Sequence, residues 1–287
     1  MTDIRVVGNG IVRIDAEAKG PAIGVICNMH GNELCGRQAV HRILEKYEIK
    51  SGSLVLIDGN QEAALLNRRF VESDMNRMFT AELLAQKNPG QDLLRAQYLA
   101  DVIPSLGLDH AIDFHSTSTE TEYPFTVSFP RSEQLTELCP VARIYGWKGI
   151  IKGPLVEWMN DLGIPTVVVE AGQHVDKKSV DVAERTLISI LSHHGLISLE
   201  KPFRMKAQNT FEVLEFVNFK DASTFRFKKV YASFDHLERG EVIANDSTRT
   251  YQVPDEEGLQ ILMPALQENV IKGISPGAYY LMRRIKV

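Results

Sequence analysis

The sequence has 287 residues, of which 44% are hydrophobic and 24% charged, the balance of a globular protein long enough for about two domains. Lys and Arg total 32 against 37 Asp and Glu, and without any basic run this acidic balance argues against a nucleic-acid partner. No apolar run reaches the ~20 residues needed to cross a bilayer, no signal-peptide core is evident, and three cysteines require no oxidising compartment, so the sequence predicts a cytoplasmic protein with no membrane partner.

The first informative stretch begins with an apolar run from Ala22 to Cys27, which is typical of a parallel strand covered on both faces. The run leads into His30-Gly31-Asn32-Glu33, where a glycine lets the chain bend towards a helix. An imidazole and a carboxylate at this spacing can converge on one metal ion. The spacing alone is weak evidence, because it arises by chance in roughly one such chain in three, and a structural turn histidine is the alternative.

The next elements alternate between helices and strands. Apolar residues at helical spacing predict an amphipathic helix over 34–47, and SLVLI at 53–57 predicts a strand that ends in the turn signal Asp58-Gly59-Asn60. A second helix is predicted over 91–103.

Between these elements lies a polar cluster that no amphipathic pattern explains: Arg69, Asn76 and Arg77. The guanidinium fork suits carboxylates, and an Arg near a metal can also stabilise an oxyanion. The alternative is a solvated surface loop, which the spacing alone favours.

The run HAIDF at 110–114 predicts a short strand with His115 at its end. Asp113 or a nearby carbonyl could hold the second ring nitrogen of this histidine, as metal-bound histidines require. Two His and one Glu with an open fourth position form a known catalytic zinc set. We therefore predict that His30, Glu33 and His115 bind one zinc ion.

A β-branched run, Thr166 to Val169, predicts a buried strand that leads directly into Glu170. Burial would raise the pKa of this carboxyl and favour proton transfer, whereas an ion-paired Glu at a sheet end is the alternative. Further strands are predicted at 124–129 and 142–145, and further helices at 155–162 and 179–193. This alternation predicts an α/β sheet with helices on both faces.

From about Pro202 short β-type runs recur between turn residues, and no helical pattern is evident. The predicted strands are 211–217, 225–232, 241–244, 260–263 and 279–282. We therefore expect two domains, an α/β domain over residues 1–200 and a small β-rich domain over residues 201–287.

Taken together, His30-Gly31-Asn32-Glu33, Asp74-Met75-Asn76-Arg77, Asp113-Phe114-His115 and Val169-Glu170-Ala171-Gly172 resemble the succinylglutamate desuccinylase and aspartoacylase family, relatives of the zinc carboxypeptidases. Order and spacing agree along most of the first 200 residues. The resemblance implies a zinc-carboxypeptidase-like mixed sheet flanked by helices, one zinc ion per chain, and a C-terminal all-β domain that covers the active site.

The same resemblance implies a role for each site residue. Glu170 would act as general base and then acid, Arg69 would polarise the scissile carbonyl, and Asn76 with Arg77 would bind a substrate carboxylate. Tyr279, in Ala278-Tyr279-Tyr280, matches a family tyrosine that closes the pocket, and a sheet aromatic is the alternative.

One position departs from the family pattern. The aspartoacylases carry a further substrate-binding Arg about ten residues before the catalytic Glu, and that spacing falls at Asn160 here. N-acetylaspartate is therefore a doubtful substrate. Residues that could replace this Arg are Lys152, Arg131 and Arg143, and the sequence favours none of them.

These observations predict a zinc-dependent hydrolase that cleaves the amide bond of an N-acyl amino acid or a similar small acylated amine bearing a carboxylate. Two alternatives stay open: a zinc carboxypeptidase acting on peptides or peptidoglycan fragments, and a catalytically silent zinc-binding protein. The sequence reveals neither the acyl group nor the amine, and it leaves homo-oligomerisation open.

Overall fold

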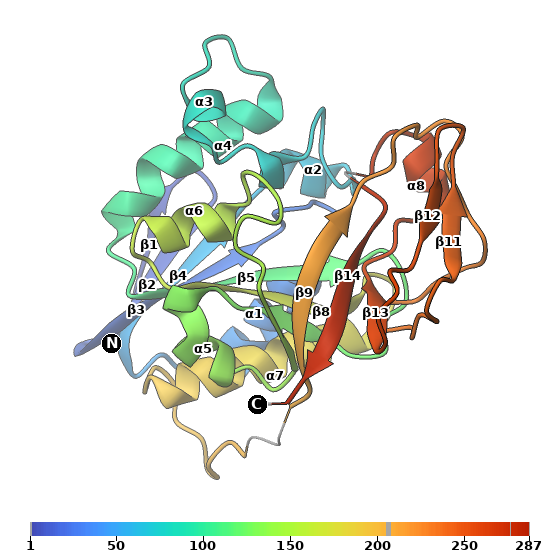
Figure 1. The fold of residues 1–287 in the computed structure, drawn as a ribbon. Coiled ribbons are helices and arrows are strands. Elements are labelled where there is room, and N and C mark those ends of the chain that lie inside the picture. Colours follow the sequence, from blue (N-terminus) through green and yellow to red (C-terminus); the bar gives the residue numbers. More distant parts are fainter. Residues whose placement is uncertain (1, 205–207, 276, 287) are drawn as a thin grey trace.

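The computed structural model describes residues 2–204, 208–275 and 277–286 (Figure 1). Among these residues a mixed sheet of eleven strands runs through the molecule. Its strands, in spatial order, are β1 (Asp3–Gly8), β2 (Ile11–Asp15), β4 (Ser51–Asp58), β3 (Ala18–Cys27), β5 (His110–Thr117), β8 (Thr166–Gln173), β6 (Phe125–Val127), β7 (Ala142–Tyr145), β9 (Thr210–Val217), β14 (Tyr279–Ile285) and β13 (Leu259–Leu262).

Helices of very different length connect these strands. The α-helices are α1 (Cys35–Lys46), α2 (Gln61–Leu65), α3 (Ala81–Leu84), α4 (Gln91–Val102), α5 (Glu133–Glu137), α6 (Leu155–Asp161), α7 (Lys178–His193) and α8 (Gln267–Ile271). Short 3-10 helices are η1 (Met75–Arg77), η2 (Ile103–Leu106) and η3 (Pro130–Ser132). Within the described parts of the chain, no helix is both long and apolar enough to cross a membrane.

The central strands are covered on both faces, as predicted. Helices α1 and α7 pack together under one face, and α4 and α6 lie over the other (Figure 1). Along β3, Ile23 and Val25 pack into the core of α1 and α7, whereas Ile26 packs into the core of α4. Because β3, β4, β5 and β8 pair in parallel, their carboxyl ends meet at one edge of the sheet.

The register of β5 and β8 determines which side chains reach the site. Phe114 on β5 and Val169 on β8 both pack into the core of α1 and α7. Since successive side chains on a strand point to opposite faces, His115 and Glu170 point to the other face. These two residues are paired in the register, so they lie side by side.

The C-terminal residues form a strand-rich region, as predicted. Strand β9 pairs with β7 and β14 pairs with β9, so the main sheet continues into this region (Figure 1). A second sheet consists of β10 (Arg226–Phe227), β11 (Val242–Asn245) and β12 (Thr250–Gln252). The short helix α8 and the N-terminal hairpin of β1 and β2 were not predicted from the sequence. The domain boundary near residue 200 stays a prediction.

Gly31 lies where the chain leaves β3 and meets the backbone of α2. A Cβ atom on this residue would lie 2.1 Å from the carbonyl carbon of Ala63 and 2.2 Å from the nitrogen of Ala64. The N–H of Gly31 also donates to the carbonyl oxygen of Arg69 at 3.2 Å. The close approach of two backbone segments therefore requires glycine here.

We expect Gly31→Ala to destabilise the protein, because the added methyl group must push α2 away from the His30–Glu33 turn. Gly163→Ala is the matched control: Gly163 has a φ of +92° but its Cβ would meet nothing within 4 Å. In urea denaturation, Gly31→Ala should lower the free energy of unfolding by about 2 kcal/mol or more beyond the decrease caused by Gly163→Ala. Equal losses would contradict the steric argument.

Candidate active site

The three residues predicted to bind a metal ion, His30, Glu33 and His115, meet in the interior. The Nδ1 atom of His30 lies 2.9 Å from Glu33 Oε1, and the Nδ1 atom of His115 lies 3.0 Å from Glu33 Oε2 and 3.2 Å from the Nδ1 atom of His30. All three side chains are buried, and their ligand atoms lie within 4.8 Å of one another. Two imidazoles and a carboxylate in this arrangement could hold a metal ion.

The far side of each imidazole is held by a carboxylate. Asp74 Oδ1 lies 3.1 Å from the Nε2 atom of His30, and Asp113 Oδ2 lies 3.1 Å from the Nε2 atom of His115. Burial lowers the pKa of His115, but the charges of Asp113 and Glu33 outweigh it and hold this pKa well above its ordinary value. Partners of this kind orient metal-binding histidines, so both Nδ1 atoms are fixed towards Glu33.

Glu33 is a buried charge with many partners. Its side chain is 1% exposed, and besides the two imidazoles it accepts a hydrogen bond from the backbone N–H of Ser116 at 3.0 Å. Arg69 Nη1 lies 3.4 Å from its Oε1 atom. Burial raises the pKa of Glu33, but the charges of His30 and His115 outweigh burial and hold this pKa well below its ordinary value.

Glu170 lies beside this cluster with unused hydrogen-bonding capacity. Its side chain is buried, and its Oε2 atom has no hydrogen-bond partner among the described residues. Burial raises its pKa to about 7, against the opposing charge of His115. A carboxyl with a pKa near neutrality can both take up and release a proton.

The polar segment before α3 brings two guanidinium groups to the site. Arg69 pairs with Asp74 at 3.0 Å. The carbonyl oxygen of Asn76 accepts a hydrogen bond from Arg77 Nη1 at 2.7 Å, and its side-chain Oδ1 accepts one from the N–H of Leu155 at 2.9 Å. The structure records no ion pair for Arg77 and no hydrogen bond from Asn76 Nδ2 within the described residues.

Asp92 on α4 holds the segment that carries these arginines. It is 1% exposed and accepts hydrogen bonds from the backbone N–H groups of Val71, Glu72 and Ser73 at 3.2, 2.6 and 2.9 Å. It also accepts one from Asn60 Nδ2 at 2.5 Å. We did not identify Asp92 from the sequence, because an acidic residue in the first turn of a helix is ordinary.

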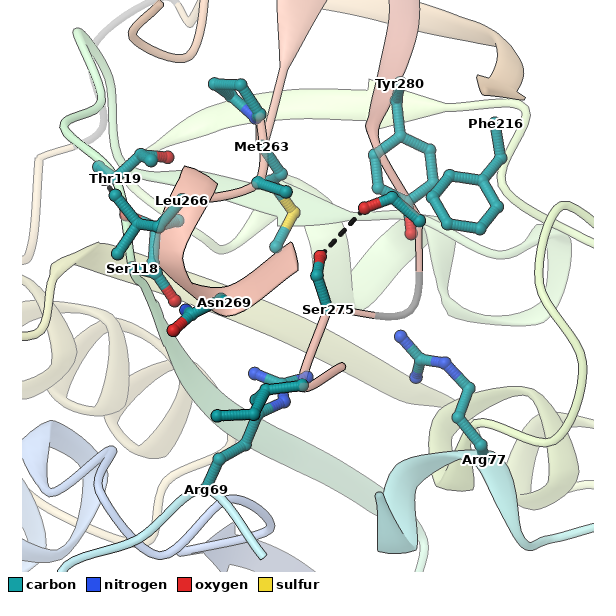
Figure 2. A pocket seen from close by; sticks show the side chains of 15 residues that line it. Arg69, Arg77, Ser118, Thr119, Phe216, Met263, Leu266, Asn269, Ser275 and Tyr280 are labelled. Carbon is teal, nitrogen blue, oxygen red and sulfur yellow. Dashed lines mark hydrogen bonds between the residues drawn. The ribbon is translucent and has the colours of Figure 1, made fainter. Parts of the chain in front are cut away.

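The C-terminal region lines one side of the pocket beside His30, Glu33 and His115. Figure 2 shows its outer part, with Arg69 and Arg77 on one side and Met263 and Tyr280 on the other. Arg69, Arg77, Met263 and Tyr280 also line the inner part, next to the ligands. The structure does not bring Tyr279 to the pocket, because alternate residues of β14 face opposite sides and Tyr279 packs into the C-terminal core.

The pocket contains the other predicted site residues. They are His30, Glu33, Arg69, Asn76, Arg77, His115 and Glu170. Asn160, at the position where the family Arg was expected, is buried in α6 and donates to the carbonyl oxygens of Val156 and Thr166, both at 2.8 Å. None of the three candidate substitutes lines the pocket: Lys152, Arg131 and Arg143.

Comparisons with known proteins identify related sequences. The model of the succinylglutamate desuccinylase/aspartoacylase catalytic domain matches residues 19–194. A probable aspartoacylase from Parasynechococcus marenigrum is 34% identical over 132 residues, which cover 44% of this chain and 43% of that relative, so the chain covers less than half of that relative's length. A succinylglutamate desuccinylase from Pseudomonas paraeruginosa is 25% identical over 281 residues, covering 88% of this chain and 82% of the relative.

Solved structures show a similar fold. The crystal structure of a succinylglutamate desuccinylase from Vibrio cholerae superimposes with a TM-score of 0.75 at 19% identity. The superposition covers 100% of this chain and 88% of that one. The mixed sheet and the strand-rich C-terminal region are therefore shared with this structure.

We expect Asp92→Ala to loosen the segment that carries Arg69 and Arg77, because three backbone N–H groups lose their acceptor. Hydrogen exchange at Val71–Ser73 should accelerate, and the free energy of unfolding should fall by about 2–4 kcal/mol. Asp101→Ala, at an exposed position of the same helix, is the control and should change stability by less than about 0.5 kcal/mol. Unchanged exchange in Asp92→Ala would rule out this anchoring role.

The raised pKa of Glu170 predicts a pH-dependent loss of stability in chelator-treated protein. The folded protein keeps this proton up to about pH 7, whereas the ordinary pKa of a Glu carboxyl is 4.5, so the contribution of Glu170 to stability falls as the pH rises through this window.

Glu170→Gln removes this ionisation. The free energy of unfolding of the variant minus that of wild type, measured by chemical denaturation, should rise by on the order of 1–3 kcal/mol between pH 4 and pH 8. The exposed Glu82→Gln should show no such trend. If the difference in free energy of unfolding between Glu170→Gln and wild type did not change with pH, burial would not raise the pKa of Glu170 as argued.

Proposed function

Because this chain belongs to the succinylglutamate desuccinylase/aspartoacylase family, we propose that it is a zinc-dependent hydrolase that cleaves the amide bond of an N-acyl amino acid or a similar small acylated amine. The observation that carries the proposal is the meeting of His30, Glu33 and His115 in a pocket that also contains Glu170 and Arg69. A cluster that could bind a metal ion, a carboxyl whose pKa lies near neutrality and a guanidinium group together fit metal-assisted amide hydrolysis.

The donor set fits zinc. Zinc bonds of ~2 Å at tetrahedral angles separate neighbouring ligand atoms by roughly 3.3 Å. The separations here are 3.2 Å between the two imidazole Nδ1 atoms, 2.9 Å from His30 Nδ1 to Glu33 Oε1 and 3.0 Å from His115 Nδ1 to Glu33 Oε2. Two histidines and one glutamate also leave a fourth position for a substrate or water molecule. The carboxylates of Asp74 and Asp113 behind the imidazoles support the same assignment.

The residues around this cluster have separate chemical roles. A bound zinc ion would act as a Lewis acid and lower the pKa of a bound water molecule. Glu170 takes the proton from the attacking water and returns it to the leaving amine. The guanidinium of Arg69 donates hydrogen bonds to the oxygen on which negative charge develops, and its pairing with Asp74 holds it in place.

Arg77 and Asn76 provide the groups for a substrate carboxylate. The guanidinium of Arg77 has no ion-pair partner among the described residues, and Asn76 is oriented by its bond to Leu155 while its Nδ2 group stays free to donate. The C-terminal region around Met263 and Tyr280 lines the outer pocket and favours a small substrate over a long peptide.

The test is amine release from N-acyl amino acids, with short peptides alongside, by zinc-loaded protein. Glu170→Gln should keep one zinc per chain but lose about 100-fold or more in kcat, whereas His115→Ala should lose the metal. Metal content by mass spectrometry separates the two effects. Near-wild-type turnover by Glu170→Gln would overturn the role of Glu170.

The same assay separates the remaining functions. Release from N-acyl amino acids that is abolished by a chelator and restored by zinc supports the deacylase. Cleavage of peptides alone would identify a carboxypeptidase, and bound zinc without turnover on any amide would identify a silent binding protein.

A further inference from the structure

We infer that the substrate releases an amino acid with one carboxylate and an apolar side chain, rather than a dicarboxylic one such as aspartate or glutamate. The inference rests on the proposed function and names the substrate class of that site. It depends on the charges that line the inner pocket and on the wall that faces them.

The inner pocket offers a single uncommitted cation among the described residues. Arg69 and Arg77 are the cationic side chains, other than the ligand histidines, in its lining. Arg69 is already paired with Asp74 at 3.0 Å and lies 3.4 Å from Glu33. Arg77 has no carboxylate within ion-pair distance among the residues that the structure describes, so its charge can compensate one substrate carboxylate.

Five apolar side chains form one wall of the inner pocket: Val127, Trp147, Ile151, Val156 and Val168. Val127 and Val168 lie opposite each other in the pairing of β6 and β8. Four members of the wall, all but Ile151, belong to one buried core cluster, and Ile151 packs against it. Two strands, helix α6 and the loop before it therefore supply the wall, and their packing into one core cluster makes the wall a fixed feature of the site.

Aromatic rings support this wall. The ring of Tyr280 is 4.5 Å from that of Phe216 in a stacked arrangement and 4.7 Å from that of Trp147. Such contacts hold large side chains in place and leave little freedom to open the wall around a charged group.

The wall lies on the side of the leaving amine. Glu170, which returns the proton to that amine, and Val168 are two residues apart on β8, so both point into the pocket from the same face of the strand. A side chain on the carbon next to the amine therefore extends towards Val168 and Val127. Its carboxylate can turn towards Arg77.

This arrangement discriminates between amino acids by charge. The second carboxylate of an aspartate or glutamate would meet apolar side chains and lose its hydration without gaining a partner. The uncharged polar groups of Asn76, Ser116, Ser118 and Tyr280 also line the pocket, and none of them can neutralise this charge. An aliphatic or aromatic side chain instead gains from burial.

The experiment compares N-acetyl-leucine and N-acetyl-phenylalanine with N-acetyl-aspartate and N-succinyl-glutamate on zinc-loaded protein. We expect kcat/KM to be about 100-fold higher for the apolar pair. Calorimetry with the product amino acids leucine and aspartate provides a readout that does not depend on turnover, and leucine should bind more tightly.

Ile151→Arg tests the wall directly, because it places a cation where the structure has none. Ile151 is half-buried in a loop, and Ile150→Arg, at the next residue and outside the pocket lining, is the matched control. For Ile151→Arg, kcat/KM should fall at least about tenfold on N-acetyl-leucine and rise on N-acetyl-aspartate. Ile150→Arg should keep the wild-type ratio of kcat/KM between the two substrates.

The outcomes separate this inference from the proposed function. A preference for N-acetyl-aspartate or N-succinyl-glutamate, or rates that depend on the acyl group alone, would overturn the apolar wall as a determinant and leave the deacylase intact. If no N-acyl amino acid is hydrolysed, the proposed function fails. The calorimetric comparison of leucine with aspartate then still decides the inference.

Discussion

The buried carboxylate of Glu33 is the interaction on which the site depends. It lies almost fully out of water and is compensated by His30, His115, Arg69 and the N–H of Ser116. These partners come from the turn after β3, the end of β5 and the segment before η1, so one charge ties three distant parts of the chain together. Removing partners from a buried charge is strongly destabilising, which makes the arrangement cooperative.

The two faces of the sheet differ in what they contact. Odd and even positions of β5 and β8 alternate between the α1 and α7 core and the pocket. The same alternation that buries Phe114 and Val169 sends His115, Val168 and Glu170 to the site. Glu170 and Val168, one member of the apolar wall, therefore share one rigid support and lie two residues apart on the same strand.

The arginine-bearing segment is not part of the sheet: Met75 packs into the core of α4, and polar contacts hold the rest of the segment. Asp92 accepts from three successive N–H groups, and Asp74 bridges His30 and Arg69. Charge-assisted hydrogen bonds of this kind are stronger than neutral ones and can hold an irregular segment in place. The strand-rich C-terminal region completes the pocket through Met263 and Tyr280.

The sequence by itself determined the alternating elements, the strand-end positions of His30, His115 and Glu170, and the fold class, because local periodicity and buried strand patterns are properties of neighbouring residues. Only the tertiary structure decided that Tyr280 rather than Tyr279 faces the pocket, since a shift of one residue on a strand reverses its side. It also decided the role of Asp92 and the make-up of the apolar wall. Those contacts join segments far apart in the chain, and no local pattern encodes such distances.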